Sequence, residues 1–165
     1  MMMIAALCML TAANAQTVTK DSLSVVKPGS KMRLDVDFSH AVIMGMDEEA
    51  FSKYETDWQT DKPTVVTRLM NGVNMKLDGV LKVNQLSSME YTLKVTVRDV
   101  TNQGFITCDA EVTDQAGRTL FAVKQVTGGV EPPFSPGTKL AKMKFWSLLT
   151  GRSLGGIIRS VYLGE

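Results

Sequence analysis

Three consecutive stretches of alternating apolar and polar residues, between residues 91 and 126, constrain the fold more than any other feature of this sequence. The stretches are separated by residues 102–104 (NQG) and 114–117 (DQAG), both of which are typical of tight turns. Apolar side chains at every second position place one face of each strand in a core and leave the other face in water. We therefore predict a meander of two consecutive β-hairpins with one apolar and one charged face.

A fourth strand is predicted at residues 31–39, where the sequence KMRLDVDFS alternates in the same way. Beyond Gly45 the apolar residues follow helical spacing instead, and Asp47 is a suitable N-cap for a helix that begins there. The apolar stripe of this helix continues to Trp58, so we predict that the helix ends near that residue.

Residues 64–77 fit two different structures. Their apolar residues recur at intervals of three and four, and Asp61 and Pro63 supply the start signals of a helix. The pair at residues 71–72 (NG), however, lies between two apolar runs and is the strongest short signal for a hairpin. The spacing favours a second helix, and the hairpin remains the alternative.

Residues 128–138 contain three prolines and three glycines, which excludes regular structure and makes this segment the link to a last helix. The expected order is therefore strand, helix, second helix, three strands and final helix. Because only one face of the strands is apolar, the helices should all cover that face. We expect a single α+β domain over residues 31–165, a two-layer sandwich with a mainly antiparallel sheet of four strands or slightly more.

The first residues, MMMIAALCMLTAANAQT, combine an apolar run with the triplet ANA at residues 13–15. This pattern is typical of a secretory signal peptide over residues 1–15, so we predict a secreted protein that is periplasmic or associated with the outer envelope. Lipidation of Cys8 is the less favoured alternative, because Leu7 is too large for the position that precedes a lipid-bearing cysteine. Residues 16–30 are polar, and we expect them to form a flexible lead-in.

The composition argues against a nucleic-acid partner and against stabilisation by a disulfide. A formal net charge of +1 gives no reason to expect a polyanionic partner, and we predict no nucleic-acid binding. After removal of the signal peptide only Cys108 remains, which excludes an intramolecular disulfide. Cys108 falls on the apolar side of its strand, so we expect it to be a small buried core residue.

The closing segment, residues 139–163, is basic and amphipathic, and it admits three interpretations. It is the last helix of the core, a helix that binds a partner, or an arm that makes weak contact with a membrane surface. Charges interrupt every apolar run, which excludes a transmembrane span. The pattern favours the core interpretation, but Phe145 and Leu149 fall opposite the apolar stripe. The candidate interaction residues are therefore Phe145, Trp146, Leu149, Arg152 and Arg159.

No catalytic, cofactor-binding or metal-binding motif stands out, and we expect a non-enzymatic protein without a cofactor. A hydrolase that uses His40, the single histidine, with Asp35 or Asp37 is the weakest alternative, because a lone histidine at a strand end more often makes local hydrogen bonds. A metal site formed by these two aspartates with Asp109 or Glu111 is also disfavoured, since such sites normally recruit several oxygen ligands from a shaped loop.

The stretches DVDFSHAVIMGMDEEAF and DWQTDKP resemble a group of small secreted proteins of Bacteroidota whose function is uncharacterised. More broadly, the strand that ends at residues 37–39, the hairpin at residues 114–117 and the glycine-rich last helix look like periplasmic α/β domains of the TolB N-terminal and CsgG type. This resemblance covers most of residues 31–163 and implies non-enzymatic work in envelope assembly or partner docking. It supplies no catalytic residues. The chain lacks a lipobox cysteine and pore-forming strands, so neither membrane anchoring nor channel formation follows from the resemblance.

Taken together, these features lead us to expect a secreted or periplasmic, non-enzymatic module that binds another component of the cell envelope, most simply a protein. A carrier of a small apolar ligand between helices and sheet is the principal alternative, and it requires an internal cavity of at least roughly 300 Å³. The sequence indicates neither the identity of the partner nor the oligomeric state.

Overall fold

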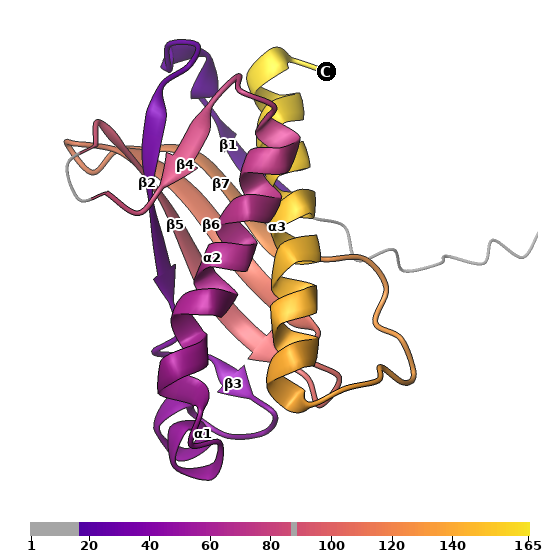
Figure 1. Ribbon diagram of the computed structural model, residues 1–165. Helices are drawn as coiled ribbons and strands as arrows, with labels where there is room; N and C mark the ends of the chain where they lie inside the picture. The colour runs from indigo at the N-terminus through magenta and orange to yellow at the C-terminus, as the bar shows by residue number, and fades with distance from the viewer. Residues whose placement is uncertain (1–16, 87–88) are drawn as a thin grey trace, which may run out of the picture.

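The computed structural model describes residues 17–86 and 89–165 (Figure 1). The predicted signal peptide, residues 1–15, lies outside these described residues. Along the described chain the elements are β1 (Thr17–Asp21), the short 3-10 helix η1 (Leu23–Val25), β2 (Lys31–Asp37), β3 (Val42–Ile43), α1 (Glu48–Tyr54), α2 (Trp58–Leu77), β4 (Lys82–Asn84), β5 (Tyr91–Val100), β6 (Ile106–Asp114), β7 (Thr119–Thr127) and α3 (Lys139–Leu163).

Within the described residues the strands form one mixed, seven-stranded sheet. Its order is β1-β7-β6-β5-β2-β4, and the short β3 pairs with β5 just beyond the end of β2. Strands β5, β6 and β7 are antiparallel neighbours, so the predicted meander is confirmed. In its register Lys94 lies opposite Glu111 and Thr96 lies opposite Asp109, which places the polar residues of the meander on one face.

The chain has the α+β class that the sequence predicts, and β1, β7, β6 and β5 are antiparallel neighbours as expected, but the sheet is mixed and has seven strands rather than four or slightly more. Strand β2 runs parallel to both β4 and β5, and β3 runs parallel to β5. After β2 the chain crosses through α1 and α2 and returns to the same end of the sheet, and a helical crossover of this kind joins parallel strands. Strand β4 has only three residues, too few for its alternation to be recognised in the sequence.

The ambiguous residues 64–77 are helical, as their spacing favours, but the helix that contains them is longer than predicted. Helix α2 begins at Trp58 and runs for 20 residues, so Pro63 lies inside it rather than in its first turn. Helix α1 correspondingly ends at Tyr54, four residues before the predicted end. The sequence therefore identifies both helices correctly and misplaces the boundary between them.

The hairpin signal at residues 71–72 is overridden by packing. Gly72 lies in the interior of α2 and is buried against α3. A Cβ atom at this position would lie 2.2 Å from the backbone oxygen of Leu148, so only glycine fits here. The residue that suggests a turn in the sequence thus serves the close approach of two helices.

Part of the predicted lead-in, residues 16–30, belongs to the folded structure. Residues Thr17–Asp21 form the edge strand β1, which is antiparallel to β7. Leu23 and Val26 are buried, and the Tyr162 hydroxyl near the end of α3 donates a hydrogen bond of 2.9 Å to the Val26 carbonyl. The segment is therefore attached to both the sheet and the last helix, which its polar composition does not reveal.

Helices α2 and α3 lie side by side across one face of the sheet (Figure 1), and two apolar clusters fill the space between helices and sheet. The larger cluster joins Leu93 of the central strand β5 to Val73 of α2 and Leu154 of α3. The second cluster lies toward α1 and contains Trp58 and Trp146. Both clusters depend on α3, so the last helix is part of the core.

The free edge of β4 is closed by a side chain of α2. The N–H of Lys82 donates to the carbonyl of Ser30 at 3.0 Å, so the N–H and C=O of the next residue, Val83, point away from β2. Asn74 bonds to both groups, because its Nδ2 donates to the Val83 carbonyl and its Oδ1 accepts from the Val83 N–H, each at 2.8 Å. The amide thus replaces a neighbouring strand at an edge that could otherwise pair with another chain.

Candidate interaction surface on the last helix

The link segment and two caps define α3 as one continuous helix of 25 residues. The Thr138 hydroxyl accepts a hydrogen bond of 3.2 Å from the N–H of Ala141, and Gly164 ends the helix in the left-handed conformation, with φ of 70°. The side that faces the sheet and α2 is buried. Its buried residues are Leu140, Met143, Trp146, Ser147, Thr150, Gly151, Leu154, Gly155 and Ile158.

Glycines bring α3 into direct backbone contact with α2. A Cβ at Gly151 would lie 2.1 Å from the carbonyl oxygen of Leu69, and one at Gly155 would lie 2.4 Å from that of Val73. The hydrogens that these glycines carry in place of Cβ therefore point at carbonyl oxygens of the other helix. We call these two residues and Gly72, which makes the reciprocal contact from α2, the glycine seam.

The opposite side of α3 faces outward and carries three of the five predicted interaction residues. Phe145, Arg152 and Arg159 are spaced by seven residues, which is about two helical turns, and therefore lie along one line. Phe145 is 54% exposed, Arg152 is exposed and Arg159 is half-buried. Leu149 is half-buried against the second core cluster, and Trp146 is only 7% exposed within that cluster. Trp146 is thus a core residue rather than part of an exposed site.

The link segment adds an aromatic residue that the sequence analysis missed. Phe134 is 73% exposed, and the ammonium of Lys142 lies 5.6 Å from the centre of its ring. The side-chain oxygen of Gln103 fastens this region, because it accepts hydrogen bonds from the N–H of Ser135 at 2.9 Å and from Lys142 at 3.3 Å. A phenylalanine among prolines in a segment that cannot be regular was the available signal for an exposed ring.

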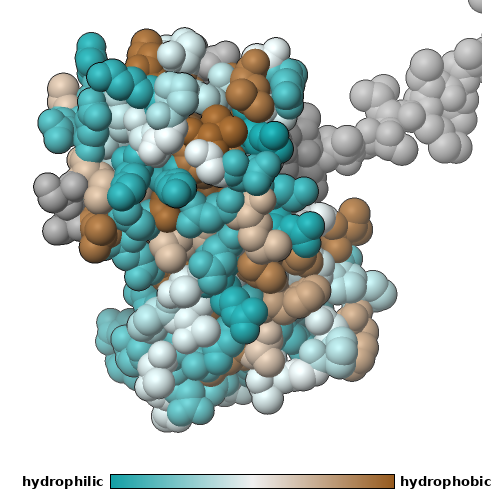
Figure 2. Space-filling view, turned by 45° about the horizontal axis from the view of Figure 1, so that its top comes forward, coloured by the Kyte–Doolittle hydropathy of each residue, from teal (hydrophilic) through white to brown (hydrophobic). Residues whose placement is uncertain are grey.

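We refer to Phe134, Lys142, Phe145, Arg152 and Arg159 as the outer surface of α3. Figure 2 shows hydrophobic groups, in brown, at the side of the molecule where the link segment meets α3, with hydrophilic groups in teal beside them. An exposed apolar patch rimmed by charged residues is typical of a protein interaction site.

The cations of α3 differ in whether the protein itself neutralises them. Lys144 forms an ion pair of 2.7 Å with Asp61, whereas Lys139 donates at 2.7 Å to the neutral Tyr54 hydroxyl, which does not neutralise it. Among residues 17–86 and 89–165, no ion pair involves Lys142, Arg152 or Arg159 either. The sequence has no acidic residue between positions 132 and 164. The outer surface of α3 therefore keeps an uncompensated positive charge.

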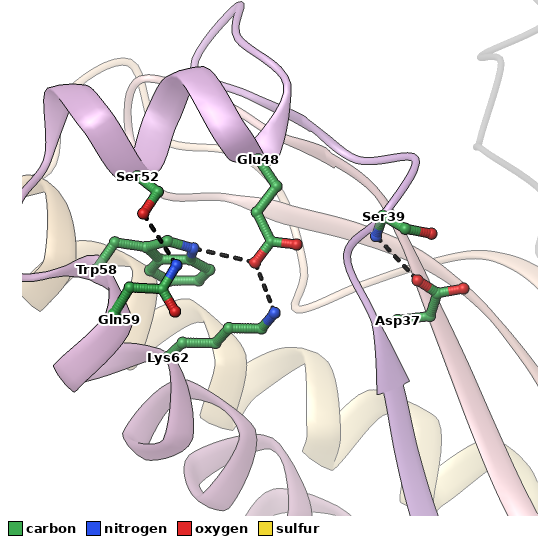
Figure 3. Close-up of polar contacts among 7 residues, drawn as sticks. All are labelled: Asp37, Ser39, Glu48, Ser52, Trp58, Gln59 and Lys62. Carbon is green, nitrogen blue, oxygen red and sulfur yellow. Dashed lines mark hydrogen bonds and ion pairs between the residues drawn. The ribbon is translucent and has the colours of Figure 1, made fainter.

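The polar residues near His40 serve local structure. His40 is exposed, and Asp37 accepts a hydrogen bond of 2.8 Å from the N–H of Ser39, as Figure 3 shows. Hydrogen bonding by Ser39, through its side chain first and its backbone second, lowers the pKa of Asp37. Asp35 is exposed on the strand before it. This arrangement caps a turn and does not hold the histidine in a catalytic orientation.

A second polar cluster in Figure 3 stabilises the start of α2. Oε1 of Glu48 accepts hydrogen bonds from the indole N–H of Trp58 at 3.1 Å and from Lys62 at 2.6 Å. The same lysine lies 5.2 Å from the centre of the Phe38 ring, which packs edge-on against Trp58. The carboxylate thus satisfies a buried indole and fixes α1 on α2, which is a structural role.

The remaining chemical candidates also have structural partners. Asp109 forms an ion pair of 2.9 Å with Arg98 and accepts from the N–H of Gln125 at 3.0 Å. In the described part of the chain no group of three or more histidine, cysteine, aspartate or glutamate side chains could hold a metal ion. Cys108 is buried, and burial raises the pKa of its thiol to about 12, so it is not a ready nucleophile.

The hollows of the molecule lie at its surface. Five of them have volumes between about 170 and 470 Å³ and are lined by charged or polar groups together with apolar ones. The largest lies over Gly156 on α3, between Arg152 and Val161. No helix in the described residues is long and apolar enough to cross a membrane.

Comparison with known proteins does not assign the chain to a family. No protein-family model matches the sequence, and no curated protein matches it. Among solved structures, the PelC dodecamer from Paraburkholderia phytofirmans is similar over 84% of this chain and 96% of its own, with 10% identity and a TM-score of 0.43. Protein XCC0632 from Xanthomonas campestris is similar over 90% and 95%, with 14% identity and a TM-score of 0.43. Likenesses of this strength carry no inference about function, and the resemblance to TolB and CsgG domains stays a prediction.

Proposed function

We propose that this protein is a non-enzymatic binding module that docks another component of the cell envelope, a protein, through the outer surface of α3. The observation that carries the proposal is the position of Phe134 and Phe145. Both rings are exposed, by 73% and 54%: Phe145 lies on α3, whose other side is packed into the core, and Phe134 lies on the link segment that precedes this helix. Exposed aromatic rings beside cations are the groups that most often dominate the binding energy of protein interfaces.

The charges on this surface support a partner of complementary chemistry. Lys142, Arg152 and Arg159 form no ion pair within the described residues, and the ammonium of Lys142 contacts only a neutral amide oxygen and a ring. Such cations remain available to carboxylates of a partner, where they guide association and fix the register of the contact. A surface of this kind favours an acidic partner with apolar groups between its charges.

The envelope location in this proposal rests on the pattern of residues 1–15, which is typical of a secretory signal peptide. The two alternative functions have weaker support. The hydrolase would need His40 to be held by an acid, whereas Asp37 is engaged by Ser39. The carrier would need an enclosed apolar cavity, whereas the space between sheet and helices is filled by the two core clusters.

Site-specific photo-crosslinking tests the proposal. The purified chain, with benzoylphenylalanine in place of Phe145, is illuminated in an extract of the cell envelope of its native organism. The matched control carries the same group in place of Met75, which is 60% exposed on α2. We expect one defined protein adduct from position 145. Its yield should be at least about tenfold higher than the yield from position 75, because a partner that occupies one site tenfold more than the other differs in binding free energy by about 1.4 kcal/mol.

The adduct should also depend on charge. Arg152→Glu should abolish it, whereas Lys124→Glu, a reversal of an exposed charge on β7, should leave it intact. Equal adduct yields from positions 145 and 75, or a yield from position 145 that is insensitive to Arg152→Glu, would contradict the proposed docking surface.

A further inference from the structure

Two adjacent glycines of α3 differ in what surrounds them. A Cβ at Gly155 would lie 2.4 Å from the carbonyl oxygen of Val73, so the fold itself requires glycine there. A Cβ at Gly156 would meet no atom within 4 Å. A glycine in a helix interior costs about 1 kcal/mol relative to alanine. Nothing in the packing of the described chain requires glycine at position 156.

The bare backbone at Gly156 forms part of a shallow, wide-open surface hollow of about 470 Å³. Small or apolar residues line much of the rest, with Ser153 and Ser160 one turn to either side of Gly156. Ile157 and Val161 supply apolar groups. Small side chains at intervals of three and four residues let a second helix approach the backbone closely, and the glycine seam uses the same device toward α2.

Cations surround this hollow. Lys76 of α2 and Arg152 line it, and within residues 17–86 and 89–165 neither forms an ion pair. Arg159 lies one turn along α3 from Gly156, outside the lining of the hollow. A carboxylate is the acceptor that a guanidinium binds most strongly, so the exposed Arg152 favours an acidic group in this hollow.

From these observations we infer that the hollow over Gly156 receives an acidic amphipathic helix of the partner protein. The inference rests on the proposed function and names the element through which the partner binds. The partner helix crosses α3 at Ser153, Gly156 and Ser160, where small residues admit a close approach. Its apolar side chains fill the space beside Ile157 and Val161. Its carboxylates face the two cations that line the hollow, Lys76 and Arg152.

The choice of a protein helix over a lipid surface follows from the shape of the site. A membrane surface would contact the exposed rings and cations along the whole outward side and would have no use for a hollow. A helix needs a crossing point that is free of side chains, and the open space over position 156, in a shallow hollow, provides one. Charge complementarity then requires that this helix be acidic.

The test extends the crosslinking experiment to a second position of the full chain. Benzoylphenylalanine replaces Ile157, an apolar residue of the hollow outside the crossing point, the envelope extract is illuminated, and the linked peptide is identified by mass spectrometry. The variant Gly156→Leu fills the hollow, and Asn71→Leu adds the same side chain to an exposed position on α2 as the matched control. Gly156→Leu should fold normally, which a thermal melt verifies, because a Cβ at this position meets open space.

We expect position 157 to link to an acidic peptide with helical spacing of its apolar residues. Gly156→Leu should lower the adduct yield by about tenfold or more, as a steric block at the centre of an interface does, and Asn71→Leu should not change it. An adduct from position 145 that is unaffected by Gly156→Leu overturns this inference and leaves the proposed function standing. A phospholipid adduct, or a linked peptide that is basic or rich in proline, overturns the inference as well. Absence of any adduct from both positions overturns the proposed function and the inference together.

Discussion

The two sides of α3 belong to the same 25-residue helix, yet one is packed closely against α2 and the other faces outward. The inward side has no charged residue among its buried positions and contacts α2 through glycines, with carbonyl oxygens where a Cβ would otherwise stand. The outward side carries Phe145 and two arginines, and a Cβ at Gly156 would meet open space. The difference shows that close packing fixes the residues on one side, whereas the fold places no such constraint on the other side.

This comparison predicts that substitutions on the two sides separate stability from binding. Those on the inward side should change the free energy of unfolding. Those on the outward side should change only the interaction with a partner. The following experiments challenge that separation, in order of decreasing expected effect.

Removal of α3 should have the largest effect. A chain that ends at Gly137 loses five large buried side chains, which are Leu140, Met143, Trp146, Leu154 and Ile158. Each contributes about 1.5–3 kcal/mol by its burial, and their sum is comparable to the whole net stability of a domain, about 5–15 kcal/mol. We expect thermal unfolding followed by circular dichroism to lose its cooperative transition. A truncated chain that melts like the full one would show that α3 is not part of the core.

The labelling rate of the buried thiol should show whether the helices cover the sheet. Cys108 is fully buried on β6 beneath the helices, and burial raises its pKa to about 12. At pH 8 a thiol reagent should label the native protein at least about 10³-fold more slowly than the urea-unfolded protein, because a domain stable by 5 kcal/mol opens that rarely. Rapid labelling of the native protein would mean that the helices do not cover the sheet.

The same thiol predicts a direction for the pH dependence of stability. Its pKa is higher in the folded state than the ordinary value of 9.0, so folding favours the neutral form. The stability that this group contributes is complete below pH 9 and is lost as the pH rises from 9 toward 12. Urea unfolding of the protein and of Cys108→Ala at pH 8 and pH 10.5 should show a smaller loss at high pH for the variant.

A single methyl group in the glycine seam should cost less stability than the removal of α3. Gly151→Ala places a Cβ 2.1 Å from the carbonyl oxygen of Leu69, a backbone atom that cannot move aside without shifting α2. Overpacking of this kind costs about 1–3 kcal/mol, which urea unfolding measures directly. Ser153→Ala on the same helix is the matched control and should stay within about 0.5 kcal/mol of the parent.

Removal of an exposed ring should have the smallest effect on stability. Phe145→Ala removes a side chain that is 54% exposed and loses one edge-on contact with Trp146, at a ring separation of 5.5 Å. We expect a cost of at most about 1 kcal/mol, together with at least a tenfold weaker interaction with the crosslinked partner. Phe51→Ala is the matched control, because Phe51 is fully buried and its removal should cost about 3–5 kcal/mol.

The sequence correctly predicts the strands and helices whose apolar residues recur at a regular interval. The alternation in residues 91–126 correctly indicates the meander, and helical spacing correctly places Phe145 outside the core. The parallel half of the sheet could not be predicted in this way, because it depends on the three-residue strand β4 and on a crossover between distant segments. A short edge strand carries too few residues to show a period, and its position follows from packing alone.

The candidate site shows the same limit. Helical spacing places Trp146 with the apolar residues of α3, and the structure packs its ring edge-on against Phe105, 4.9 Å away, in the core. Phe134 was missed although its proline-rich segment is a signal for exposure; that Gln103 fastens this segment to α3 is seen only in the structure. Helical spacing also places Gly155, unlike Gly156, beside the apolar stripe, but it does not reveal that α2 is the helix that approaches there.

The difference between Gly155 and Gly156 provides the most direct test that α3 has one packed side and one free side. The measurement is the free energy of unfolding of Gly155→Ala and Gly156→Ala, two identical changes at adjacent residues, by urea titration under the same conditions. Gly155→Ala should lose about 1–3 kcal/mol to the clash with the Val73 carbonyl. Gly156→Ala should gain about 0.5–1 kcal/mol from the better helix propensity of alanine. Changes of the same sign in both variants would contradict the division of α3 into a packed side and a free side.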